Sequence, residues 1–148
     1  MTVWFDWLDE EQLVIAYLSA KLRMRDLVNP IDSEDSDPRF RRYNELIVIQ
    51  DVQKFTGRER GTNIAMEMSE NYGPDPGYKS AYVVKGAVDL GLVRIFNAYR
   101  GRHADSVEAF LGIEPALSFL GHEDEEIRTN CYQLLEQHAH ESGEELWF

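Results

Sequence analysis

Apolar residues recur every three or four positions over much of this 148-residue chain, the spacing that places them on one face of an α-helix. The first such run lies between the acidic stretch 9–11, suited to a first helical turn, and Asn29-Pro30, which stops a helix. Its apolar members are Leu13, Tyr17, Ala20, Met24 and Leu27. The pattern predicts an amphipathic helix that begins near Asp9 and ends before Pro30.

A second helix is predicted to start at Asp37-Pro38, because aspartate caps helices well and proline suits the first helical position. Phe40 and Ile47 continue its apolar face, and the helix extends to about Phe55. Taken alone, the run 46–49 also fits a strand, because it reads Leu-Ile-Val-Ile.

The middle of the chain predicts a short helix over 59–71, a loop over 71–77 and a longer helix over 78–99. The loop contains two glycines and two prolines, which do not continue a helix. Within the longer helix, residues 82–84 are the one strand-like stretch, since they read Tyr-Val-Val.

The last third of the chain predicts two more helices, over 105–120 and over 124–140. Gly121-His122 is their tight connection. Gly112 and Pro115 place a break or kink in the first of the two helices.

These helices pair into antiparallel hairpins, which predicts an all-α protein with a single domain spanning residues 1–148. The hairpins cover about 9–55, 59–99 and 105–140. Apolar–basic residue pairs stand at related places in them, 44 and then 43 residues apart. The pairs are Phe40-Arg41, Val84-Lys85 and Ile127-Arg128.

These pairs, together with Asp37-Pro38 just before the first of them, resemble the HEAT repeat family, whose two-helix units carry an acidic residue, often proline, and then an apolar–arginine pair in the turn. Residues 113–128 also look like a HEAT hairpin, with Glu125 where the family has proline. The resemblance implies hairpins stacked as a short right-handed superhelix, and an irregular helical bundle is the alternative. The apolar residues within 4–8 and 146–148 would cap the stack, or else form an interface for homo-oligomers.

The formal net charge of −12 at pH 7 and a pI near 4.7 oppose binding to nucleic acid, since phosphate backbones are bound largely through Lys and Arg. Residues 105–148 hold eleven Asp and Glu, with Arg128 as their one Lys or Arg. The first thirty residues contain neither a signal-peptide pattern nor a membrane-length apolar span, and Cys131 is the one cysteine of the chain. We therefore expect a cytoplasmic protein with no membrane partner.

No residue pattern in the sequence predicts catalysis, a cofactor or a metal. Cys131 falls on an apolar helical face with Ile127, which favours a core thiol over a nucleophile. His138 and His140 stand two positions apart on a helix, so their rings point to different faces. The acidic stretch 32–37 lacks the spacing of a calcium loop, and phosphate-loop and catalytic motifs are missing from the sequence. We expect a protein that is not an enzyme.

Acidic residues near the last helix are the candidate binding site for a basic protein partner. The dipole of a helix is complemented by one or two of the four charges at 123–126, which leaves the others for a cationic surface. The predicted partner-binding residues are Glu114, Glu123, Asp124, Glu125, Glu126 and Glu136. In size and acidity the chain resembles immunity proteins that neutralise toxins, which implies an inhibitor of a basic toxin or nuclease domain.

A HEAT-like scaffold or adaptor subunit of a protein complex is the alternative function. Such a protein would hold a peptide or another protein in the groove lined by the second helices of the hairpins. The basic residues expected in that groove are Arg39, Arg42, Lys79, Lys85 and Arg94. The HEAT-like DNA glycosylases would add an enzymatic function, which the negative charge and the short chain oppose.

Overall fold

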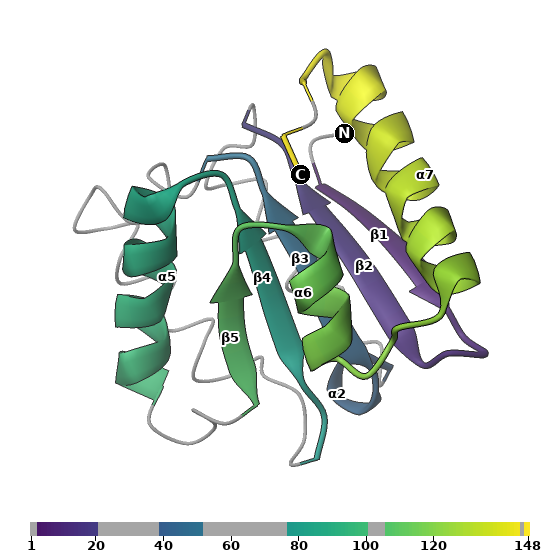
Figure 1. The fold of residues 1–148 in the computed structure, drawn as a ribbon, viewed down its shortest axis with the longest axis horizontal. Helices are drawn as coiled ribbons and strands as arrows, with labels where there is room; N and C mark the ends of the chain where they lie inside the picture. Colours follow the sequence, from purple (N-terminus) through teal and green to yellow (C-terminus); the bar gives the residue numbers. More distant parts are fainter. Residues whose placement is uncertain (1–2, 21–38, 52–76, 101–105, 146) are drawn as a thin grey trace.

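Five β-strands form the centre of the molecule in the computed structural model, which describes residues 3–20, 39–51, 77–100, 106–145 and 147–148 (Figure 1). In chain order the elements are β1 (Val3–Leu8), β2 (Leu13–Leu18), α2 (Arg39–Arg42), β3 (Asn44–Ile49), β4 (Ser80–Val84), α5 (Ala87–Arg100), β5 (Val107–Phe110), α6 (Ile113–Phe119) and α7 (Glu125–Ser142). The strand order is β1-β2-β3-β4-β5, with β1 antiparallel to β2 and all other neighbours parallel. No helix in the described ranges combines the length and the apolar character needed to span a membrane.

The protein therefore has an α/β fold, and the predicted all-α fold with HEAT-like stacking is wrong. The three apolar–basic pairs lie in unlike elements: Phe40-Arg41 in α2, Val84-Lys85 at the end of β4, and Ile127-Arg128 in α7. Their spacing of 43 and 44 residues is thus not a structural repeat. The expected helical hairpins are also wrong, as is the helical bundle, because each of the three segments contains at least one strand.

The helix predicted over residues 9–27 is replaced by a strand because its apolar run is continuous. Residues 13–18 are all apolar, and every side chain from Leu13 to Tyr17 is buried, so β2 is covered on both faces. A strand buried on both faces shows no alternation, and helical spacing can be drawn through any continuous apolar run. Residues 21–27, the end of that predicted helix, lie outside the described residues.

Two further strands stand where helices were predicted. Residues 46–49 lie in β3, as the alternative interpretation of this run indicated, and three of the four are β-branched. The strand-like residues 82–84 likewise belong to β4, so the helix predicted over 78–99 begins only at Ala87 as α5. The helix predicted over 59–71 lies outside the described residues.

The helix predictions are confirmed best near the end of the chain. The helix predicted over 124–140 is α7, and the tight connection before it contains Gly121 with φ of 86°. The break predicted near Gly112 is the junction between β5 and α6. A strand ends and a helix begins there, where a kinked helix was expected.

The main core lies between the sheet and the helices α6 and α7, which both cover one face of it (Figure 1). Strand register builds this face, because Ile15 lies beside Leu46 and Leu46 beside Ala81. The buried residues of this core are Leu13, Ile15, Tyr17, Leu46, Val48, Ala81, Val83, Ile113, Ala116, Leu117, Leu120, Cys131, Leu135 and Ala139. Burying each large apolar side chain contributes about 1.5–3 kcal/mol, so this layer dominates the stability of the fold.

A polar contact fixes α7 on the margin of the sheet. The Nε2 atom of His138 on α7 lies 2.6 Å from Oδ2 of Asp6 on β1, and the His138 side chain is only 8% exposed. The Trp4 ring stacks on the imidazole, with 5.1 Å between ring centroids. The apolar residues within 4–8, predicted to cap a helical stack, thus belong to an edge strand of the sheet.

We expect Leu46→Ala to lower the free energy of unfolding by about 2–5 kcal/mol, because it leaves a cavity in the middle of β3. The matched control is Leu111→Ala, since Leu111 is 51% exposed and its loss should change stability by no more than about 0.5 kcal/mol. Urea unfolding of both variants measures the difference. Equal losses would contradict the placement of residue 46 in the core.

Candidate functional site

The candidate site begins at the N-terminus of α7, where four acidic residues follow one another. Asp124 caps the helix, because its Oδ1 accepts a hydrogen bond of 2.7 Å from the backbone N–H of Glu126. Glu125 and Glu126 lie in the first turn, where carboxylates complement the positive end of the helix dipole. Glu123 precedes the cap and has no such role in the helix.

Of the six predicted partner-binding residues, all of which are exposed, the structure brings five together and separates the sixth. Glu114 on α6 joins the group at 123–126, since its Oε1 lies 3.6 Å from Nη1 of Arg128, one turn into α7. Glu136 follows Glu126 by ten residues, which places it about 15 Å further along the helix. Glu136 is thus not part of the same surface.

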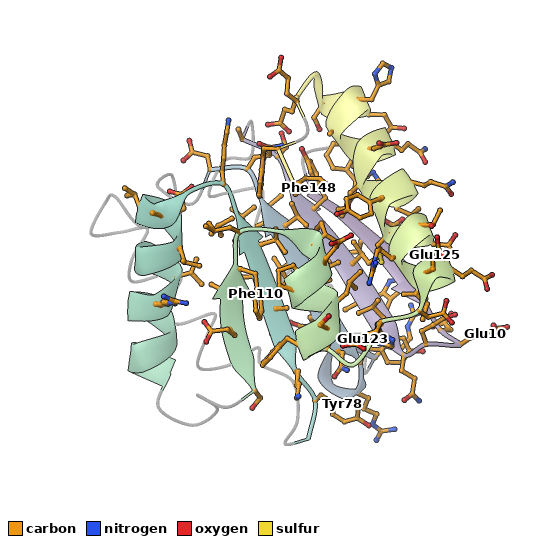
Figure 2. All side chains as sticks on the ribbon, viewed as in Figure 1. Glu10, Tyr78, Phe110, Glu123, Glu125 and Phe148 are labelled. Atoms are coloured by element: carbon orange, nitrogen blue, oxygen red, sulfur yellow. The ribbon has the colours of Figure 1, made fainter. Side chains whose placement is uncertain are left out.

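The turn between β1 and β2 adds two more acidic residues to this surface. Glu11 is close enough to α7 and the connection before it to act electrostatically on His122. Glu10 lies on the same side of the molecule as Glu123 and Glu125 (Figure 2). We call these seven residues the acidic surface: Glu10, Glu11, Glu114, Glu123, Asp124, Glu125 and Glu126.

The contribution of this turn was not predicted from the sequence, because residues 9–11 suit the first turn of a helix equally well. The signal that could have found it is the position of a short polar stretch between two strand-length apolar runs, which is typical of a hairpin. Gln12 completes the turn with φ of 51° and donates its backbone N–H to the carbonyl of Asp9 at 3.3 Å.

The imidazole of His122 adds little positive charge to the acidic surface. Burial lowers the pKa of His122, and the nearby Glu11 carboxylate opposes that shift. A histidine whose pKa is lowered from its usual value is mostly neutral at pH 7. Among the described residues, cations stand at the margins of the surface: Arg128 contacts Glu114, and Arg39 contacts Asp9 in the β1–β2 turn.

The basic residues that the scaffold hypothesis placed in one groove are divided between separate parts of the fold. Arg39 and Arg42 lie in α2, and Lys79 is near them because its backbone N–H donates to Asn44 Oδ1 at 2.8 Å, whereas Lys85 and Arg94 lie elsewhere. Arg39 contacts Asp9 at 3.2 Å and lies 4.0 Å over the Trp7 ring, whereas Arg94 contacts Glu108 at 3.5 Å. Lys79 precedes β4 and Lys85 follows it, so these two lie at opposite ends of a strand. The expected groove requires stacked helical hairpins of the HEAT type, and this protein is built on a β-sheet instead.

The cysteine and histidines of α7 have structural surroundings. Cys131 is fully buried, and burial raises the pKa of its thiol to about 12, with a smaller contribution from Glu11. His138 is buried against Asp6 whereas His140 is exposed, so the two rings do lie on different faces. Among the described residues, no three His, Cys, Asp or Glu side chains are grouped to hold a metal ion.

Comparison of the chain with protein-family models, with curated proteins and with solved structures finds no match.

We expect Asp124→Ala to lower the free energy of unfolding by about 1 kcal/mol, because the variant loses the side chain that caps α7. Asp124→Asn is the matched control, since asparagine caps a helix nearly as well and removes the same charge. Thermal or urea unfolding compares the two. A loss as large in the asparagine variant would show that charge, and not capping, is the contribution of Asp124.

We expect Cys131 to resist alkylation in the folded protein between pH 7 and pH 9. An ordinary thiol reacts faster through this range because its thiolate fraction grows, but the pKa of Cys131 is raised to about 12 and its side chain is buried. Reaction with iodoacetamide, followed by mass spectrometry with and without urea, measures this. Rapid labelling of the folded protein at pH 8 would contradict the buried position.

Proposed function

We propose that this protein is a non-catalytic binding protein whose acidic surface docks on a basic surface of another protein, as an inhibitor of the immunity type docks on a toxin or nuclease domain. The observation that supports it is the convergence of seven acidic residues from three separate segments of the chain at one end of α7. Segments distant in sequence build this surface only in the folded protein.

The acidic surface carries more negative charge than the fold itself needs. Arg128 offsets Glu114, and the N-terminus of α7 is equivalent to about half a positive charge. The remaining carboxylates repel one another, which destabilises the isolated protein slightly. A cationic partner surface relieves this repulsion on binding, so the excess charge favours association with a basic protein.

Charge of this kind acts mainly on the rate of association. Exposed carboxylates attract a basic partner over about one Debye length, roughly 8 Å at physiological salt. Inhibition by masking a basic active site needs fast association, which electrostatic steering provides. This is why we favour an inhibitor over a scaffold, whose HEAT groove is not part of this fold.

Affinity capture from the native host, with a wash of moderate salt, identifies the partner. We expect one basic protein domain bound at near-equal stoichiometry. Recovery of an acidic partner, or of several subunits of one assembly, would contradict the proposal.

With the partner in hand, we expect the triple variant Glu123→Gln, Glu125→Gln and Glu126→Gln to associate on the order of tenfold more slowly at low salt, with the difference shrinking at high salt. Asp124 is kept because it caps α7. The matched control neutralises three exposed glutamates outside the acidic surface: Glu136, Glu141 and Glu145. Stopped-flow or surface-plasmon kinetics compare the two, and equal slowing by both variants would contradict a localised site.

A further inference from the structure

The segment that follows α7 is bound to the sheet through a glutamate. Glu144 Oε1 accepts a hydrogen bond of 3.0 Å from the Tyr17 hydroxyl, and Oε2 accepts one of 2.7 Å from the backbone N–H of Ala20. Each oxygen of the carboxylate thus has its own donor at the end of β2. Figure 1 shows residues 143–145 and 147–148 at this end of the sheet, beside the last residues of β2 and β3.

A second set of contacts centres on Gln50, which directly follows β3 and is buried. Its Nε2 donates to the Tyr17 hydroxyl oxygen at 2.8 Å and to the backbone carbonyl of Glu145 at 3.2 Å. Its Oε1 accepts a hydrogen bond of 2.8 Å from the indole N–H of Trp147. Gln50 therefore holds Tyr17 in place and binds the segment at two points.

The Tyr17 hydroxyl is suited to donate a hydrogen bond to a carboxylate. Tyr17 is fully buried, and burial raises the pKa of its hydroxyl; the hydrogen bond from Gln50 opposes the rise and the Glu144 charge adds to it. The hydroxyl consequently stays protonated and donates. The site also lies at the carboxyl ends of the parallel strands β2 and β3, where α/β proteins commonly bind ligands.

We propose that Tyr17, Ala20 and Gln50 form a peptide-binding site, which Glu144, Glu145 and Trp147 of the same chain fill as an intramolecular ligand. In trans the site accepts an acidic–aromatic peptide of a partner protein, with a glutamate followed three residues later by a tryptophan. This site is separate from the acidic surface and does not rest on the function proposed for it.

The segment leaves α7 at a glycine C-cap, where the backbone N–H of Glu144 still donates to the Ala139 carbonyl at 2.8 Å, so release concerns the contacts beyond this cap. Gly143 ends the helix with φ of 66°, a left-handed conformation that glycine adopts freely. Trp147 and Phe148 pack against the core but are only partly buried. A segment with such contacts can open locally without unfolding the sheet. Because a tethered segment has an effective concentration on the order of millimolar, a free peptide competes poorly until the segment is released.

The test uses a fluorescent peptide, Gly-Glu-Glu-Leu-Trp-Phe, which copies residues 143–148. The full chain carrying Glu144→Ala and Trp147→Ala is the opened variant. We expect the opened variant to bind the peptide at least tenfold more tightly than the unchanged protein in fluorescence anisotropy. Adding Tyr17→Phe to the opened variant keeps the ring but removes the donor, and should weaken binding about tenfold.

The matched control peptide carries glutamine in place of the first glutamate and alanine in place of tryptophan. Equal binding of both peptides, or no binding up to millimolar concentration by an opened variant that circular dichroism shows to be folded, would overturn the proposal. If the unchanged protein forms a dimer and the peptide dissociates it, the site binds a second copy of this chain. That result would also overturn the proposal that the ligand is a peptide of a partner protein.

Hydrogen exchange of the unchanged protein tests the same proposal without any substitution. The Ala20 amide is bonded to Glu144, so release of the segment exposes it, whereas the β3 amides stay protected by the sheet. We expect Ala20 to exchange at least a hundredfold faster than Val48. Equal exchange rates would mean that the segment opens only when the whole protein unfolds, and the proposal would fail.

Discussion

The contact between Asp6 and His138 joins α7 to β1, alongside the apolar packing of Cys131, Leu135 and Ala139, and much of the structure depends on where α7 lies. Asp6 is the one charged residue of β1, and its strand neighbours Trp4 and Leu8 pack against the main core. Burying a carboxylate in such surroundings costs free energy unless it is paired. His138 on α7 supplies the partner. Trp4 stacks on the imidazole and completes the contact.

Once α7 is placed, its two ends acquire different surroundings. The N-terminal end meets the β1–β2 turn and α6, where the acidic surface forms. The C-terminal end, about 27 Å away for 18 residues, delivers Glu144 to the ends of β2 and β3. Helix α7 thus separates the acidic surface from the contacts that Glu144 makes with Tyr17 and Ala20.

Helix α7 and the break at Gly112 were predictable from sequence because their signals are local. The strands were not, since residues 13–18 are buried on both faces and a continuous apolar run fits helix and strand alike. Five of the acidic residues were predicted, but Glu10 and Glu11 belong to a turn that depends on recognising those strands. The carboxylate site at Tyr17 was beyond prediction, because it joins residues 127 positions apart.

The most direct test of this account is a double-mutant cycle between Asp6 and His138, measured by urea unfolding of Asp6→Ala, His138→Ala and the combined variant. A hydrogen bond to a charged group contributes about 1.5–3 kcal/mol, and contacting residues deviate from additivity by a similar amount. We therefore expect a coupling free energy of at least about 1.5 kcal/mol. Losses that add to within about 0.5 kcal/mol would show that β1 and α7 are not held together by this pair, and would contradict the account.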